Sequence, residues 1–194
     1  MRAESIREGV STGFVAFLLA ILVSLPTGGG LSSFPPAVAI PLTLVVVGVG
    51  VLFDTIGLAA ASAEESSFHA MAAKKIPGAR QSILVVKNAG RVITICNDIV
   101  GDLAGTLSGA MAAGTVFRLT AGGPVSQSLA GAMAIALVAG ITVGAKAAAK
   151  RLAIENAVEI TRFTGYALYL LEQSTGLRVF RNGKGGGFPS RRRR

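Results

Sequence analysis

The chain has 194 residues, of which 51% are hydrophobic and only 15% charged; a soluble domain carries about a quarter charged residues, so the composition indicates a membrane protein. Nineteen Lys and Arg against ten Asp and Glu give a net charge of +9, but this apolar chain has no basic nucleic-acid motif, so no nucleic-acid partner is expected. The single cysteine, Cys96, and the single histidine, His69, exclude a disulfide framework, a Cys-based zinc cluster and a His-rich metal site, and without a nucleophile beside a base we predict no enzyme.

Four apolar stretches are candidates for membrane spans, since a helix needs about 20 residues to cross the hydrocarbon core. They cover residues 10–25, 37–63, 92–117 and 129–149. The first stretch is the shortest, and its alternative interpretation is the apolar region of a cleaved signal peptide. The second is the most apolar. We therefore predict an all-α fold, a polytopic membrane helical bundle.

The basic residues between the spans predict the orientation of this bundle. The loop between the second and third spans contains Lys74, Lys75, Arg80, Lys87 and Arg91. The segment 26–36 carries no charge. Because basic loops stay in the cytoplasm, we expect a multi-pass protein of the cell membrane with loop 64–91 and both termini cytoplasmic.

Three segments outside the spans are predicted to be amphipathic helices beside the cytoplasmic membrane surface. Residues 64–75 run from acids to lysines, which complements a helix dipole. A second short helix covers residues 79–88, and a third follows the last span and is expected in the membrane interface. The apolar residues of this third helix are Ala153, Ile154, Ala157, Val158, Ile160, Ala167, Leu168 and Leu171.

The chain divides into three parts on this basis. Residues 1–36 form an extra helix with an extracytoplasmic loop, and residues 37–176 form the transmembrane domain. Residues 177–194 are glycine-rich and end in four arginines, which predicts a disordered basic tail. We expect the tail and the basic loop to bind anionic lipids, since each Lys or Arg near such a surface contributes about 1 kcal/mol.

The third span contains polar residues that a lipid-facing helix would not tolerate. Asp98 and Asp102 are four residues apart, next to Asn97, and are predicted to share one helix face as oxygen ligands for a hard cation. An ionised Asp at a helix centre costs roughly 2.5–3.5 kcal/mol, so these acids need a cation or another partner. The alternative is a structural ion pair with Lys146 of the last span. Asp54, in the second span, has no partner that the sequence identifies.

Small residues at every fourth position predict close helix packing. The series on the third span is Gly101, Gly105, Gly109 and Ala113, and that on the fourth is Gly140, Gly144 and Ala148. Such series let helix backbones approach each other within a membrane. We therefore expect a homodimer through the third and fourth spans.

Several short motifs occur in an order that resembles a known transporter domain. They are Ala-Ser-Ala-Glu-Glu-Ser at 61–66, Gly-Ala-Arg at 78–80, Val-Val-Lys-Asn at 85–88, Cys-Asn-Asp-Ile-Val at 96–100 and Ala-Lys-Arg-Leu-Ala-Ile-Glu-Asn at 149–156. Over about residues 45–175 this order is similar to the membrane domain of the CorC/CNNM magnesium transporters, also called DUF21 or the CNNM transmembrane domain.

The resemblance implies a magnesium-transporter-like protein that binds a dehydrated divalent cation between transmembrane helices. It places Ser62, Asn97 and Gly144 at the metal, and the polar face of the third span adds Asp98 and Asp102. The expected ion is Mg²⁺, with Na⁺ as the second candidate.

The departures from the family pattern favour an alternative. The family has Gly-Glu where this chain has Ala145-Lys146, and Pro where it has Ala149. The regulatory pair of cystathionine-β-synthase (CBS) type nucleotide-binding domains, which usually follows the membrane domain, is not in this sequence. The alternative is therefore a non-transporting membrane interaction subunit that retains the fold and pairs with a full-length relative. A Lys146 side chain inserted among the acids would favour this alternative, and one extended towards the cytoplasm would favour transport.

Overall fold

The computed structural model describes residues 2–29, 35–121 and 126–175. The helices are α1 (Arg2–Gly29), α2 (Pro36–Ser62), α3 (Glu65–Ala73), α4 (Ala79–Lys87), α5 (Ala89–Ile93), the π-helix η2 (Thr94–Gly101), α6 (Asp102–Leu119), α7 (Gln127–Glu155) and α8 (Ala157–Thr175). No strand occurs within the described ranges, so the predicted all-α fold is confirmed. The tail at 177–194 and its predicted disorder lie outside these ranges.

Three of these helical segments are long and apolar enough to cross a membrane. They are Pro36–Ser62, the continuous run Ala89–Leu119 through α5, η2 and α6, and Gln127–Glu155. Together they support the interpretation of the chain as a membrane protein. The first predicted span lies in α1, where the apolar stretch Gly9–Leu22 is shorter. The count of four spans stays a prediction.

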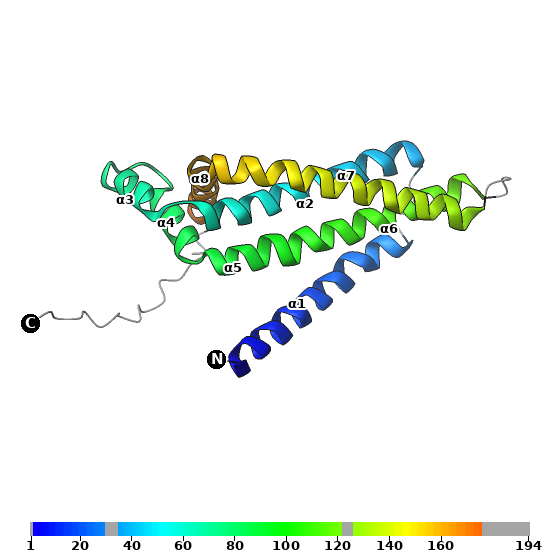
Figure 1. The fold of residues 1–194 in the computed structure, drawn as a ribbon, viewed down its shortest axis with the longest axis horizontal. Helices are drawn as coiled ribbons and strands as arrows, with labels where there is room; N and C mark the ends of the chain where they lie inside the picture. Colours follow the sequence, from blue (N-terminus) through cyan, green and yellow to red (C-terminus); the bar gives the residue numbers. More distant parts are fainter. Residues whose placement is uncertain (1, 30–34, 122–125, 176–194) are drawn as a thin grey trace, which may run out of the picture.

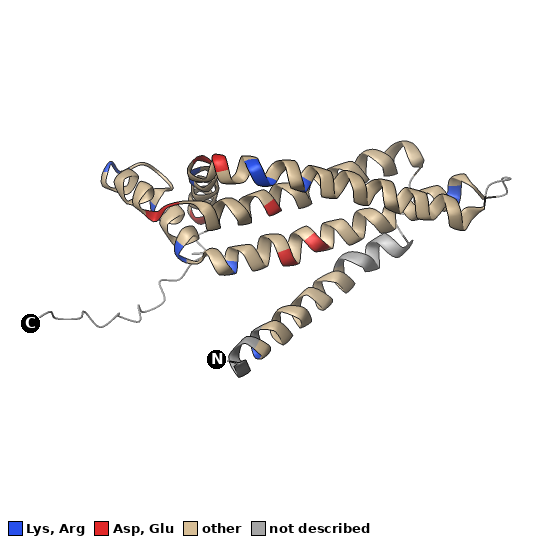
Figure 2. Cartoon of the chain, viewed as in Figure 1, with Lys and Arg blue, Asp and Glu red and all other residues tan. Residues whose placement is uncertain are grey.

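The three long segments lie side by side, and α1 diverges from them (Figure 1). The short helices α3 and α4 lie at one end of this bundle together with α8, which is seen end-on in Figure 1 and so runs across α7. Most of the Lys and Arg residues that the structure describes lie towards this end, and acids occur both there and in the middle of α2 and of the η2–α6 segment (Figure 2). The N-terminal end of α1 lies towards the same end.

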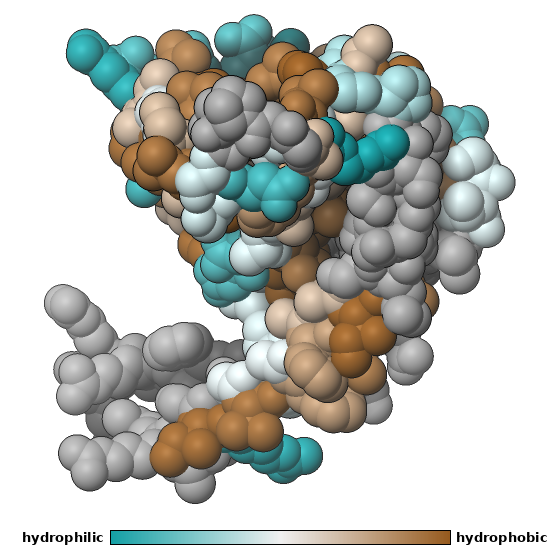
Figure 3. Space-filling model, turned by 90° about the vertical axis from the view of Figure 1, so that its right-hand side faces the viewer, coloured by the Kyte–Doolittle hydropathy of each residue, from teal (hydrophilic) through white to brown (hydrophobic). Residues whose placement is uncertain are grey.

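The surface of the bundle is largely apolar. Hydrophobic residues occupy much of the outer face seen from the end away from α8 (Figure 3). Exposed large side chains include Phe17 at 59%, Leu44 at 52% and Leu137 at 66%. A surface of this kind fits lipid contact, because contiguous apolar patches are rarely left in water.

Local sequence accounts for the helices at the end of the bundle. Pro36 occupies the first turn of α2, where a missing N–H costs nothing. Pro77 and Gly78 separate α3 from α4, so both predicted short helices are confirmed. Glu65 Oε1 lies 2.7 Å from His69 Nε2 and 3.1 Å from Lys87 Nζ, and these contacts, that with His69 first, lower the pKa of Glu65. The carboxylate thus ties α3 to α4.

Helix α8 is fixed against α4 by a close backbone contact. Gly78 has a φ of +82°, which favours glycine. Ser82 Oγ donates hydrogen bonds to the carbonyl oxygens of Gly78 (3.1 Å) and Thr161 (3.2 Å). A Cβ atom at Gly165 would lie 2.7 Å from the Ser82 backbone nitrogen and 2.8 Å from the Gly78 oxygen. Only a residue without a side chain fits this crossing.

The long segment Ala89–Leu119, which is the third predicted span, contains a π-helix that its sequence pattern did not predict. It covers Thr94–Gly101, between the α-helical residues of α5 and α6. Its buried Cys96 packs with Ala60, Val85 and Val92 in a core cluster. Cys96 is therefore a packing residue of this core. π-Helical turns often occur at functional positions, and the polar residues of this span lie in and beside it.

Candidate functional site

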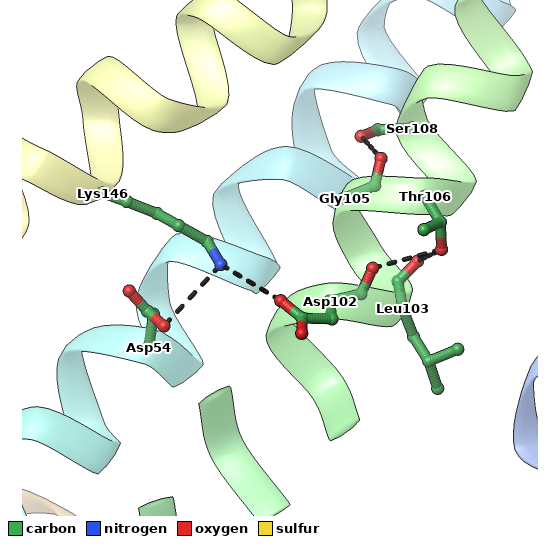
Figure 4. Close-up of polar contacts among 7 residues, drawn as sticks. All are labelled: Asp54, Asp102, Leu103, Gly105, Thr106, Ser108 and Lys146. Atoms are coloured by element: carbon green, nitrogen blue, oxygen red, sulfur yellow. Dashed lines mark hydrogen bonds and ion pairs between the residues drawn. The ribbon is translucent and has the colours of Figure 1, made fainter. Parts of the chain in front are cut away.

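A lysine and two aspartates from three different helices meet inside the bundle (Figure 4). Lys146 Nζ of α7 lies 3.7 Å from Asp54 Oδ1 of α2 and 3.9 Å from Asp102 Oδ1 of α6. The side chains of Asp54 and Lys146 are only 10% and 20% exposed, whereas that of Asp102 is 75% exposed. We call these three residues the charged triad. Its Lys146 side chain is inserted between acids and does not extend towards the bundle end.

Gly101 makes room for the triad. A Cβ atom there would lie 3.3 Å from both Lys146 Nζ and the Cys96 carbonyl oxygen, and 3.7 Å from Asp54 Oδ1. Even a methyl group would press on the ammonium group and on the backbone. A glycine at the last residue of η2 therefore lets α2, α6 and α7 bring their charges together.

The triad is held by charge and not by direct hydrogen bonds. Both N···O distances exceed the usual hydrogen-bond range of about 2.7–3.2 Å, and contacts of this length are often bridged by water. With both acids ionised, two negative charges face one positive charge. The two carboxylates then stabilise the Lys146 ammonium group, and the triad as a whole carries one net negative charge.

A second polar feature of the bundle interior is the side-chain oxygen of Asn97. Its Oδ1 atom is buried and has no hydrogen-bond partner among the described residues. The side chain packs on Gly57, one helical turn from Asp54 in α2, and a Cβ atom at position 57 would collide with Oδ1. Buried polar atoms are normally paired, so such an exception needs an explanation, for example a water or an ion.

The other predicted metal ligands are not brought to the triad. Asp98 is exposed and lines a cleft between η2 and α1, opposite Thr12. Ser62 is exposed in a pocket near Glu64 and Asn156, eight residues and thus about 12 Å along α2 from Asp54. Gly144 is exposed with open space around its Cα. Within the described ranges no three His, Cys, Asp or Glu side chains are placed to hold a metal ion.

Of the two acids that the sequence suggested as partners of Lys146, Asp102 is confirmed and Asp98 is not. In the part of the chain that the structure describes, Lys146 pairs with Asp54 and Asp102, and no ion pair joins it to Asp98. Asp54, for which the sequence showed no partner, is the most buried member of the triad. A signal was present: Asp54 is the one charged residue of α2, and Lys146 is the first charged residue of α7.

The predicted small-residue faces are also arranged differently. Gly101 points into the bundle, whereas Gly105 and Gly109 have open space where a side chain would lie. Gly101 therefore lies against the charged triad, whereas Gly105 and Gly109 leave an open face on α6, and the homodimer through this face stays a prediction. Gly140 and Gly144 of α7 also have open space where a side chain would lie, so they do not pack against α6 within one chain.

No family model, no curated protein and no solved structure matches the chain. The resemblance to the CorC/CNNM membrane domain stays a prediction from the residues.

Proposed function

We propose that this chain is a non-transporting membrane interaction subunit with a CorC/CNNM-like helix arrangement, in which Lys146 occupies the place of a dehydrated cation. The observation that carries the proposal is the inserted Lys146 ammonium group, 3.7 Å from Asp54 and 3.9 Å from Asp102. A divalent cation at the same place would have to displace this ammonium group or bind beside it. Either event costs electrostatic energy that is large inside a membrane protein.

The partners and location follow from the same proposal. The subunit lies in the cell membrane with both termini cytoplasmic, as the basic loop predicts. It forms a homodimer or pairs with a full-length relative that carries the CBS pair. The basic loop and tail bind anionic lipids.

A second candidate function, a magnesium-transporter-like protein, is favoured by one observation. The buried Asn97 Oδ1 has no partner among the described residues, and an oxygen of this kind is a ligand for hard cations such as Mg²⁺ or Na⁺. Asn97 packs on Gly57, one helical turn along α2 from Asp54, so a displaced Lys146 would leave the oxygens of Asp54 and Asp102 free for a cation in this part of the bundle.

Isothermal titration with Mg²⁺ distinguishes the two candidates. We expect the purified protein to give no saturable heat at low or high sodium, because the ammonium group already compensates the acids. Asp54→Asn removes one acid of the triad. Lys150→Met is the control for the loss of a charge outside the triad, since Lys150 is exposed on α7, the helix of Lys146. Saturable binding by the unmodified protein, weakened by Asp54→Asn and unaffected by Lys150→Met, would contradict the subunit proposal and support the transporter.

The homodimer has its own test. Gly105→Leu and Gly140→Leu place large side chains on open faces of α6 and α7, and we expect at least one of them to reduce dimer in detergent solution. Gly48→Leu is the control, because Gly48 is equally open but lies on α2. Chromatography with light scattering measures the mass. An unchanged dimer in both variants would place the interface elsewhere.

A further inference from the structure

Helix α8 has two apolar faces, and only one of them is used by the protein. Thr161 and Gly165 are buried against α4, and Leu168 packs on the core cluster of Ala60, Val85, Val92 and Cys96. Large side chains elsewhere on the helix remain uncovered. They are Phe163 at 74%, Tyr166 at 43%, Leu170 at 45% and Leu171 at 52% exposure.

The uncovered residues form one continuous stripe. Positions 163, 166, 170 and 171 are spaced by three or four residues or adjoin, which places them on one side of an α-helix. This side is opposite the one that carries Thr161 and Gly165. Of the apolar residues expected in the interface, Ala157 and Leu168 pack inside the protein, whereas Leu171 lies in the stripe. The exposed face of α8 therefore differs from the one expected from the sequence.

The direction of the stripe is fixed by the contact with α4. The close approach of Gly165 to Gly78 and Ser82 prevents α8 from rotating about its axis, because any other face would bring a side chain onto the α4 backbone. The helix also runs across α7 (Figure 1). When the long helices stand across a bilayer, α8 consequently lies along its surface.

We infer that the stripe of Phe163, Tyr166, Leu170 and Leu171 inserts into the lipid bilayer at the boundary between headgroups and acyl chains. The chemistry of the surroundings fits this partner. Tyr166 and Tyr169 stack with ring centroids 6.4 Å apart, and tyrosine is enriched at this depth of a membrane. Exposed Arg162 next to the stripe can contact lipid phosphates. Amphipathic helices of this type bury their apolar face about 5–10 Å into the interface.

This inference is independent of the proposed function, because it requires only that the three long helices span a bilayer. The alternatives to lipid are that a second copy of the chain or a cytoplasmic protein packs on the stripe. In those cases the stripe would face water whenever the protein is dispersed as single copies in vesicles.

The test measures the environment of single residues. In a Cys96→Ala background, cysteines replace Phe163, Leu170 or Ser66, one at a time, and carry the fluorophore NBD. The protein is reconstituted at high dilution into vesicles of phosphatidylcholine with one third phosphatidylglycerol. Phe163 is 74% exposed, so its label displaces no packed side chain. Ser66 is the control, because it is exposed on α3, a helix that exposes no large hydrophobic side chain.

We expect labels at 163 and 170 to emit at shorter wavelength than the label at 66 and to be quenched by lipids with a nitroxide near the headgroup. Iodide in the buffer should quench mainly the label at 66. Equal quenching of all three labels by iodide, or a shift at 163 and 170 that appears only at high protein density, would overturn the inference. The second result would indicate a second copy as the occupant.

Discussion

Lys146→Met is expected to lower the free energy of unfolding by about 3–5 kcal/mol, the range measured when one partner of a buried ion pair is removed. The substitution keeps a long apolar side chain, so the loss comes from the charge. Asp54 would remain only 10% exposed, without the ammonium group that lies 3.7 Å away in the native protein. Denaturant unfolding in detergent micelles measures the change.

Three comparisons attribute this loss to the triad. Lys150→Met should have little effect, because Lys150 is exposed on the same helix. Lys146→Met combined with Asp54→Leu should regain most of the stability, since replacing a whole buried pair by apolar residues is often neutral. Asp102→Asn should have a smaller effect than Lys146→Met, because Lys146 and Asp54 remain paired at 3.7 Å in that variant. If Mg²⁺ restores the stability of Lys146→Met, the acids bind a cation and the subunit proposal is wrong.

The sequence predicted the helical architecture because hydrophobic length and charge placement are local signals. The long spans in α2 and α7 appear as apolar stretches interrupted by only one charged residue each, Asp54 and Lys146, and α3 and α4 are separated by Pro77 and Gly78. Each of these features depends on residues within a few turns. None requires knowledge of which helices pack together.

The candidate site depended on packing, and there the prediction was less complete. A regular α-helix through the third span would place Asp98 and Asp102 on one face. The chain instead forms a π-helix at Thr94–Gly101. That change of register separates Asp98 from Lys146 and turns Gly101 into the bundle. The pairing of Asp54 with Lys146 joins residues 92 positions apart. Such pairs follow from tertiary structure, and only their complementary charges in two apolar spans indicated them.

Gly165→Ala provides the last test, because two physical effects predict opposite signs. In an exposed helix interior, replacing glycine by alanine stabilises by about 1 kcal/mol. At position 165, however, the new Cβ atom would lie 2.7 Å from the Ser82 nitrogen and 2.8 Å from the Gly78 oxygen. These are backbone atoms of α4 and cannot rotate away. Overpacking costs typically 1–3 kcal/mol, so we expect net destabilisation.

Gly144→Ala is the matched control, since position 144 lies in helix α7 with open space around it. There the helix propensity acts alone, and stability should rise by up to about 1 kcal/mol. Hydrogen exchange locates the effect: in Gly165→Ala the amides of α8 should exchange faster than those of α7, because the crossing with α4 is what holds α8 in place. If Gly165→Ala is as stable as Gly144→Ala, the close crossing of α4 and α8 does not exist in solution, and the fixed direction of the α8 stripe is lost with it.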